Sequence, residues 1–254
     1  SPKSSGEGKS AHKADEGKQG DKPGGAEGKC AGAATSPRGR LKKGSSSSSG
    51  TGVSDYGDIL LMPTTRELQL NNGAESGVDN GYASRFDKET EAAVPGFYNC
   101  YLTDYDIDVA LTTTLRTGFH KYQFNADGAR HVVLDLEHRD KLISSSLEKY
   151  SDREFGGSRV SEAWATEQHV YFYLEFSTPV QSQIQKSDSV GKQAVYCFSF
   201  EDHMLEVMVK VGISAVSIEN AKANLEAEIP HWDFEKTKGE ARAAWNKQLA
   251  KIEV

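Results

Sequence analysis

The sequence has few cysteines, no long apolar run, and no aromatic residue in its first fifty positions. Its three cysteines, Cys30, Cys100 and Cys197, are too few for a disulfide framework in 254 residues. Cys100 and Cys197 lie inside apolar, strand-like runs, which favours two buried thiols. No Cys-x-x-Cys and no paired His/Cys spacing occurs, which argues against a structural zinc site.

The chain also lacks any apolar stretch of about 18 residues, the length that a transmembrane helix needs. No apolar region follows the basic start, so no signal peptide is visible. Because the chain begins at Ser1 and not at Met, we interpret it as a processed product or a fragment, for which a missing targeting signal says little about compartment.

Residues 1–50 differ in composition from the rest of the chain. They hold ten of the 30 basic residues and five of the 37 acidic ones, which leaves 20 basic and 32 acidic residues in 51–254. Leu41 is their only large aliphatic residue. Such a segment cannot offset an ordering cost of roughly 1–2 kcal/mol per residue, so we predict a disordered, low-complexity tail over residues 1–50.

From Gly57 onward, apolar residues recur with a period of two, which is typical of half-buried strands. Turn residues such as Asp127-Gly128 separate the runs, and no helical pattern comes between them. Many short strands of this kind predict a mainly β protein with an antiparallel β-sandwich. The sets expected to share a face are Ile107, Val109, Leu111, Thr113 and Leu115; Val170, Phe172, Leu174 and Phe176; Ala194, Tyr196, Phe198 and Phe200; and Leu205, Val207, Val209 and Val211.

Helical patterns come only at the end of the chain. Ser217 is a good N-cap for a first helix that Pro230 stops. A second helix, over roughly residues 237–252, carries an apolar stripe that needs a partner surface. The members of this stripe are Ala241, Trp245, Leu249 and Ile252.

Six segments follow one another in a recognisable order. They read GTGVSDYGDILLMP, ETEAAVPGFYNCYL, RTGFHKYQF, HVVLDL, WATEQHVYFYLEFSTP, and KVGISAVSIENAKANLEAE with PHWDF. Together they resemble the N-terminal β-sandwich domain of glycoside hydrolase family 92, the calcium-dependent, exo-acting α-mannosidases. The resemblance covers residues 50–254, and the order of the six segments makes it specific.

The resemblance implies a galactose-mutarotase-like supersandwich followed by linker helices and a catalytic (α/α) barrel. It places the general acid, the general base and the calcium ligands chiefly in that barrel, so we assign no catalytic residue and no metal ligand to this chain. We expect a sandwich domain over residues 51–230 and a linker helix over residues 231–254. Because KKGSSSSSG stands where the family has a histidine and further strands, we expect the fold to lack its first strands as well as the barrel.

Three residues are candidates for contacting sugar. Thr51 and Asp55 lie in the loop before the first strand, where Asp55 and Asp58 flank Tyr56-Gly57. The alternative is a turn whose aspartates bind backbone N–H groups. Glu91 precedes a Pro-Gly turn that the family keeps near its barrel, and the alternative is a solvated loop carboxylate.

Other polar and aromatic residues have an ordinary structural interpretation beside the functional one. His120 matches a family histidine, but a histidine in a strand is more often a packing residue than a ligand. Trp164, Trp232 and Trp245 could stack on sugar rings, or they could be buried. The tyrosines of HVYFYLE are expected on the outer face of a sheet.

The acidic balance of residues 51–254 argues against nucleic acid as a partner and does not repel a neutral glycan. The function that the resemblance implies is the carbohydrate-binding, interface half of an α-mannosidase acting on mannose-containing glycans of glycoproteins. Its partners would be the glycan and the C-terminal (α/α) barrel, and its location periplasmic or secreted. A freestanding carbohydrate-binding sandwich is the alternative.

Overall fold

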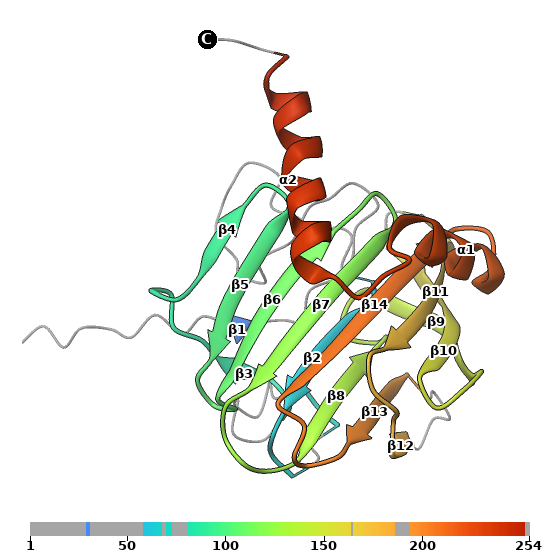
Figure 1. Cartoon of the computed structure of the whole chain (residues 1–254). Coiled ribbons are helices and arrows are strands. Elements are labelled where there is room, and N and C mark those ends of the chain that lie inside the picture. Colours follow the sequence, from blue (N-terminus) through green and yellow to red (C-terminus); the bar gives the residue numbers. More distant parts are fainter. Residues whose placement is uncertain are drawn as a thin grey trace, which may run out of the picture.

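The computed structural model describes residues 29–30, 58–67, 70–72, 81–163, 165–185 and 194–251. A sheet of eight strands faces a sheet of four strands, and two helices follow near the C-terminal end (Figure 1). All strand pairs in both sheets are antiparallel. The prediction of a mainly β antiparallel sandwich with C-terminal helices is confirmed.

The strand order is β4-β5-β6-β7-β14-β11-β10-β9 in the larger sheet and β12-β13-β8-β2 in the smaller one. The larger sheet contains β4 (Ala92–Val94), β5 (Phe97–Leu102), β6 (Ile107–Thr113), β7 (Thr117–Phe124), β14 (Glu206–Ser214), β11 (Gln168–Phe176), β10 (Glu154–Glu162) and β9 (Lys141–Lys149). The smaller sheet contains β12 (Ser182–Gln185), β13 (Val195–Phe200), β8 (Arg130–Asp135) and β2 (Leu60–Thr64).

One short strand comes from the segment expected to be a disordered tail. This strand, β1 (Lys29–Cys30), pairs with β3 (Ser84–Arg85). The other residues of 1–50 lie outside the described residues, so the disorder of that segment stays a prediction.

Aromatic side chains join the two sheets at the centre of the core. Phe198 of the smaller sheet has its ring centroid 4.7 Å from that of Phe155 and 5.0 Å from that of Phe176, both in the larger sheet. Phe200 adds a contact with Phe176 at 5.2 Å. Edge-to-face contacts of this kind add to the large apolar area that each ring buries, so this cluster is a main source of the fold's stability.

The pattern of alternation extends further along the sequence than the strands do. Leu115 lies in the turn between β6 and β7 and is 71% exposed, because the ladder of this hairpin ends at Thr113 and Gly118. Leu205 lies just before β14 and is 67% exposed. Both were wrongly predicted to share the buried face of their strands, since period two alone does not locate the end of a strand.

Helix α1 (Ile218–Glu228) covers the outer face of β11 and β14. Its N-cap is Ser217, whose side chain accepts a hydrogen bond from the backbone N–H of Asn220, as predicted. A Cβ on Gly212 would lie 2.3 Å from the carbonyl oxygen of Ala221, so the close approach of α1 to β14 needs glycine there. Tyr173 points to the outer face as expected, but α1 buries it.

Helix α2 (Phe234–Leu249) begins three residues earlier than predicted. Asp233 is its N-cap and accepts a hydrogen bond from the backbone N–H of Lys236, a start signal that the sequence analysis passed over. The expected boundary at residue 231 falls between α1 and α2, and nothing in the structure tests it. In the described part of the chain, neither helix combines the length and the apolar character needed to cross a membrane.

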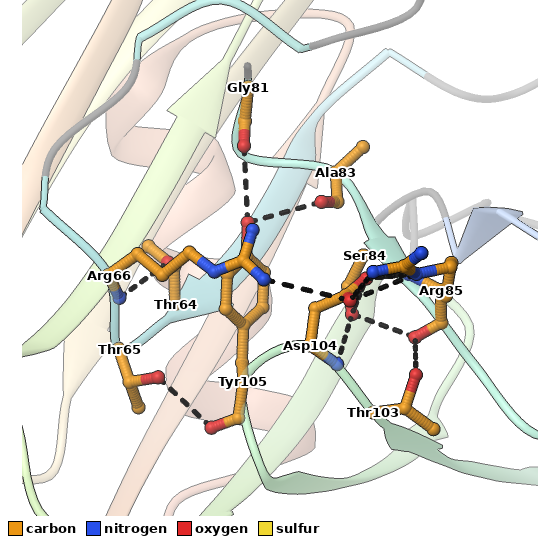
Figure 2. A network of polar contacts seen from close by, with 10 residues as sticks. All are labelled: Thr64, Thr65, Arg66, Gly81, Ala83, Ser84, Arg85, Thr103, Asp104 and Tyr105. Atoms are coloured by element: carbon orange, nitrogen blue, oxygen red, sulfur yellow. Dashed lines mark hydrogen bonds and ion pairs between the residues drawn. The ribbon is translucent and has the colours of Figure 1, made fainter. Parts of the chain in front are cut away.

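The end of the sandwich opposite α2 is closed by polar contacts around Asp104 (Figure 2). The Asp104 carboxylate accepts hydrogen bonds from the backbone N–H of Arg85 at 2.6 Å and from the Arg85 guanidinium at 2.6 Å and 3.0 Å. Arg66 adds an ion pair at 3.6 Å. Burial favours the neutral carboxyl group, but the hydrogen bonds from Arg85 and the charges of Arg85 and Arg66 outweigh it and lower the pKa of Asp104.

Tyr105 follows directly and ties the same end to the segment before β3. Its hydroxyl group donates to the carbonyl oxygens of Ala83 at 3.1 Å and Gly81 at 3.3 Å, and its own carbonyl oxygen accepts from Thr65 at 3.0 Å (Figure 2). Residues that are distant in sequence are thus fixed beside one another by directional bonds.

We predict that the free energy of unfolding depends less on pH below neutrality in Asp104→Asn than in the unmodified chain. A carboxyl group with a lowered native pKa stabilises the fold above its unfolded pKa of about 4, and this contribution is lost as the pH falls through the native pKa. The variant should be less stable at pH 7 and lose less free energy of unfolding between pH 7 and pH 3, measured by urea denaturation. Asp108→Asn, at an exposed position of β6, is the control. An unchanged slope in Asp104→Asn would contradict the assignment.

Candidate functional site

One end of the sandwich collects loops from both sheets, and we call it the α2 end because α2 projects from it (Figure 1). In the larger sheet, β5, β7, β9 and β11 begin at this end, and β6, β10 and β14 finish there. In the smaller sheet, Leu60 of β2, Asp135 of β8 and Val195 of β13 are paired at the same end. Loops at one end of a rigid sandwich are a usual place for binding residues.

The first turns of α2 are packed on the outer face of the larger sheet through a small aromatic cluster, which we call the α2 foot. Phe234 lies 5.3 Å from Phe119 and 6.4 Å from Phe97, measured between ring centroids. Trp232 lies 5.9 Å from Phe119 on its other side. Phe119, Ile229 and Phe234 are buried, so the start of α2 has a hydrophobic core of its own.

The tip of the β4–β5 hairpin packs against the next turn of α2. Gly96 has a φ of +82°, and a Cβ there would lie 2.9 Å from the Cβ of Ala241. The carbonyl oxygen of Gly96 accepts a 2.7 Å hydrogen bond from Thr112. The Pro-Gly turn of the sequence therefore has a definite role, because it lets the hairpin approach the helix closely.

Beyond Ala241, α2 leaves the sheet. The apolar stripe continues through Trp245, which is partly buried, to Leu249, which is 54% exposed. Val94, on the hairpin beside the helix, is also exposed. Ile252 lies outside the described residues. The predicted need of this stripe for a partner surface therefore holds for its second half, whereas Ala241 is packed on the sandwich.

A buried arginine joins the two sheets at the α2 end. Arg159 of β10 has a fully buried side chain and donates to Asp58 at 2.8 Å. It also donates to the carbonyl oxygen of Leu136 at 2.7 Å, to the Ser161 hydroxyl group at 2.7 Å and to the carbonyl oxygen of Arg139. These acceptors sit close to strand ends at the α2 end, before β2 and β9, after β8 and in the last residues of β10, so Arg159 fixes the loops of this end relative to one another.

Asp58 is the only part of the predicted Thr51–Asp58 loop that the structure describes. Its carboxylate accepts from Arg159 and, at 3.3 Å, from Gln168 of β11. Asp58 thus anchors the start of β2 through side-chain partners, and not through the backbone N–H groups that a capped turn would use. Thr51 and Asp55 lie outside the described residues.

Glu91, the third predicted residue, precedes β4 on the hairpin that contacts α2. It is partly buried, and its carboxylate accepts a 3.0 Å hydrogen bond from the Tyr98 hydroxyl group. The Tyr98 hydroxyl group thus helps to hold Glu91 on the hairpin, and a contact between Glu91 and sugar stays a prediction.

The structure does not bring Asp58 and Glu91 together. Asp58 contacts β10 and β11, whereas Glu91 adjoins β4 at the edge of the same sheet. At about 4.8 Å per strand, the five steps from β4 to β11 span roughly 24 Å. Asp58 lies at the α2 end, whereas Glu91 precedes Ala92, which pairs with Asn99, and so lies further from that end than the hairpin tip.

Other candidates behave as structural residues. His120 is buried, and its Nδ1 lies 2.8 Å from the Tyr122 hydroxyl group. Burial lowers the pKa of His120 to about 3, so it is neutral at physiological pH. Cys100 and Cys197 are buried and form no disulfide, as predicted, and burial raises the pKa of Cys197 to about 12.

Neither a metal site nor an exposed tryptophan is seen in the described part of the chain. Within it, no three His, Cys, Asp or Glu side chains are grouped so that they could hold a metal ion. Trp232 is partly buried in the α2 foot, and Trp245 is partly buried on α2. Trp164 lies outside the described residues.

Two residues with central positions were missed by the sequence analysis. Arg159 stands in the strand EFGGSRVSE, between Ser158 and Val160. Lys210 stands in MVKVGIS at a position that faces outward, where a lysine is usually solvated. Lys210 is buried because the connection between α1 and α2 lies over β14. The alternation of apolar residues along a strand does not indicate whether another segment covers its outer face.

Comparisons with known proteins agree on one family. The family model described as glycosyl hydrolase family 92 N-terminal domain matches residues 44–214, and the model described as glycosyl hydrolase family 92 catalytic domain matches residues 220–254. No curated protein sequence matches the chain significantly.

Solved structures give the same answer for the fold. The GH92 α-mannosidase BT3965 from Bacteroides thetaiotaomicron is 30% identical, with a TM-score of 0.72 over 80% of this chain and 30% of that chain. The GH92 inverting mannosidase BT2199 from the same organism is 21% identical, with a TM-score of 0.65 over 77% of this chain and 27% of that chain. The chain therefore spans less than a third of the length of these enzymes.

We predict that Gly96→Val displaces α2. The substitution combines a strained backbone at φ +82° with a clash against Ala241, and should cost about 1–3 kcal/mol of stability in urea denaturation followed by tryptophan fluorescence.

Gly239→Ala is the matched control on the helix itself. A Cβ on Gly239 meets nothing within 4 Å, so this change should stabilise the protein by about 0.5–1 kcal/mol through helix propensity. Equal stability of Gly96→Val and the unmodified chain would show that the hairpin tip does not hold α2.

Proposed function

The chain belongs to glycosyl hydrolase family 92, and from this premise we propose that it is the N-terminal sandwich and interface part of an exo-acting α-mannosidase. Its substrates would be mannose-containing glycans of glycoproteins. The observation that carries the proposal is the succession of the two family models along the chain, with the change from one to the other at the start of α1. The helix that follows, α2, leaves the sandwich with apolar residues still exposed.

We further propose that the rest of the catalytic domain lies over the α2 end. Trp245, Leu249 and Val94 would provide the apolar contact, because exposed apolar side chains grouped beside a projecting helix favour a packed partner. The loops of the α2 end would then form one wall of the substrate cleft. This wall excludes water and helps to orient the sugar, while the reacting groups lie on the facing domain.

The chemistry of this family class constrains where the reacting groups lie. Inverting hydrolysis needs two carboxyl groups about 6.5–9.5 Å apart, one protonated and one ionised to activate water. We propose that both come from the remainder of the catalytic domain, and that calcium, when bound, supplies a positive charge for holding sugar hydroxyl groups there. Among the described residues, no three His, Cys, Asp or Glu side chains are grouped so that they could hold a metal ion, and no step is assigned to the ion.

Thr51, Asp55 and Glu91 remain our candidates for contacting sugar from the sandwich side. For Glu91, the support is its place on the β4–β5 hairpin, whose tip contacts α2. For Thr51 and Asp55, the support is that Asp58 anchors their loop beside Arg159. A periplasmic or secreted location follows from the family alone.

We predict that the 254-residue chain by itself releases no mannose from an α-mannoside in the presence of calcium, whereas the intact protein does. A reducing-sugar assay against a no-enzyme blank measures this. Turnover by the chain alone would overturn the assignment of the reacting groups to the facing domain. Calorimetric titration of the chain with mannobiose distinguishes half of a substrate cleft from a freestanding binding module. Only a freestanding module should bind mannobiose with a Kd below about 1 mM.

Glu91→Gln in the intact enzyme should lower kcat/KM by about tenfold, because a charged acceptor for a sugar hydroxyl group is lost. Tyr98→Phe is the matched control, since it removes the hydrogen bond from the Tyr98 hydroxyl group to Glu91 without changing the carboxylate. If both variants lose activity equally, Glu91 acts only by holding the hairpin.

A further inference from the structure

A lysine is buried beneath the connection between α1 and α2. Lys210, in the middle of β14, has a side chain that is 3% exposed. The connection from Ile229 to Asp233 crosses the outer face of the sheet at this point, and Trp232 and Ile229 belong to the α2 foot. A charged group at this depth needs compensating partners.

Three partners from three different segments surround the Lys210 ammonium group. It lies 2.8 Å from the Glu175 carboxylate of β11 and donates to the carbonyl oxygen of Ile229 at 3.3 Å. It also lies 4.2 Å from the centroid of the Trp232 ring. One cation therefore bonds to the sheet, to the residue that ends α1, and to the residue just before α2.

These contacts differ in kind from the aromatic packing around them. Packing of rings and aliphatic side chains tolerates small shifts. When hydrophobic cores are substituted, the single well-ordered arrangement is lost before stability is lost. A buried ion pair contributes little net stability after its desolvation cost, but its geometry allows few alternatives. The Lys210 contacts are thus suited to selecting one arrangement of the joint.

We propose that Lys210 is a positioning residue that fixes the direction in which α2 leaves the sandwich. If the proposed function holds, Lys210 thereby sets how the facing domain sits over the α2 end. The proposal about the joint concerns residues within this chain, so it can be tested without any hydrolytic assay.

A neighbouring lysine provides a matched comparison. Lys121 of β7 also faces the α2 foot, with its ammonium group 6.0 Å from the Phe234 centroid and 3.3 Å from the Glu206 carboxylate. Its side chain is 35% exposed, and its partners Glu206 and Phe234 do not belong to the α1–α2 connection. Lys121 should therefore be dispensable for the direction of α2.

The test is a distance measurement between spin labels on the 254-residue chain. One label is placed at Lys247→Cys on the projecting half of α2 and the other at Ser144→Cys on β9, both exposed positions, in a Cys30→Ser background. Cys100 and Cys197 are buried and stay unlabelled. Double electron–electron resonance gives the distance distribution, and thermal denaturation gives the melting temperature of each variant.

Lys210→Met combined with Glu175→Gln should broaden the distance distribution about twofold while the melting temperature is largely kept, because both partners are replaced and no unpaired charge is left behind. Lys121→Met should leave the distribution unchanged. Trp232→Leu, which keeps the Lys210–Glu175 ion pair, serves if the double variant does not fold, and should broaden the distribution as well. A distribution as narrow as that of the unmodified chain in the double variant or in Trp232→Leu would overturn the proposal.

Discussion

The contact between the first turns of α2 and the outer face of the larger sheet determines how the rest of the molecule can be used. Phe119, Phe234 and Trp232 form the apolar part of this contact, and the tip of the β4–β5 hairpin supports the next turn of the helix through Gly96. These residues hold the start of α2 on the sheet, and the second half of the helix extends from the sandwich as an arm whose direction we assign to the Lys210 contacts. An arm of this kind can carry a further domain at a defined angle.

The two ends of the sandwich are built for different tasks. At the end opposite α2, Asp104 and Tyr105 bind neighbouring segments through short, direct hydrogen bonds, and the charges there compensate one another. At the α2 end, Arg159 donates hydrogen bonds to loop carbonyl groups and to Asp58. It thereby fixes the loops that, in our proposal, face the further domain. The aromatic core between the sheets makes both ends rigid.

The fold class and the capping of α1 could be predicted from the sequence, because alternation and the Ser217 N-cap are local signals. Family membership could be recognised as well, from the order of six segments. The ends of strands could not be located, as Leu115 and Leu205 show, since alternation continues into turns. Nor could Lys210 or Arg159 be identified, because their burial depends on segments distant in sequence. Whether Thr51 and Asp55 face a sugar remains a prediction.

The central claim is that a further domain covers the α2 end, and hydroxyl-radical footprinting of side chains tests it most directly. The measurement compares the 254-residue chain with the intact protein. The account predicts that Trp245, Leu249 and Val94 become protected in the intact protein, while Leu205 at the opposite end keeps its reactivity. If Trp245 and Leu249 are as reactive in the intact protein as in the chain, or if protection falls on Leu205 instead, the account is wrong.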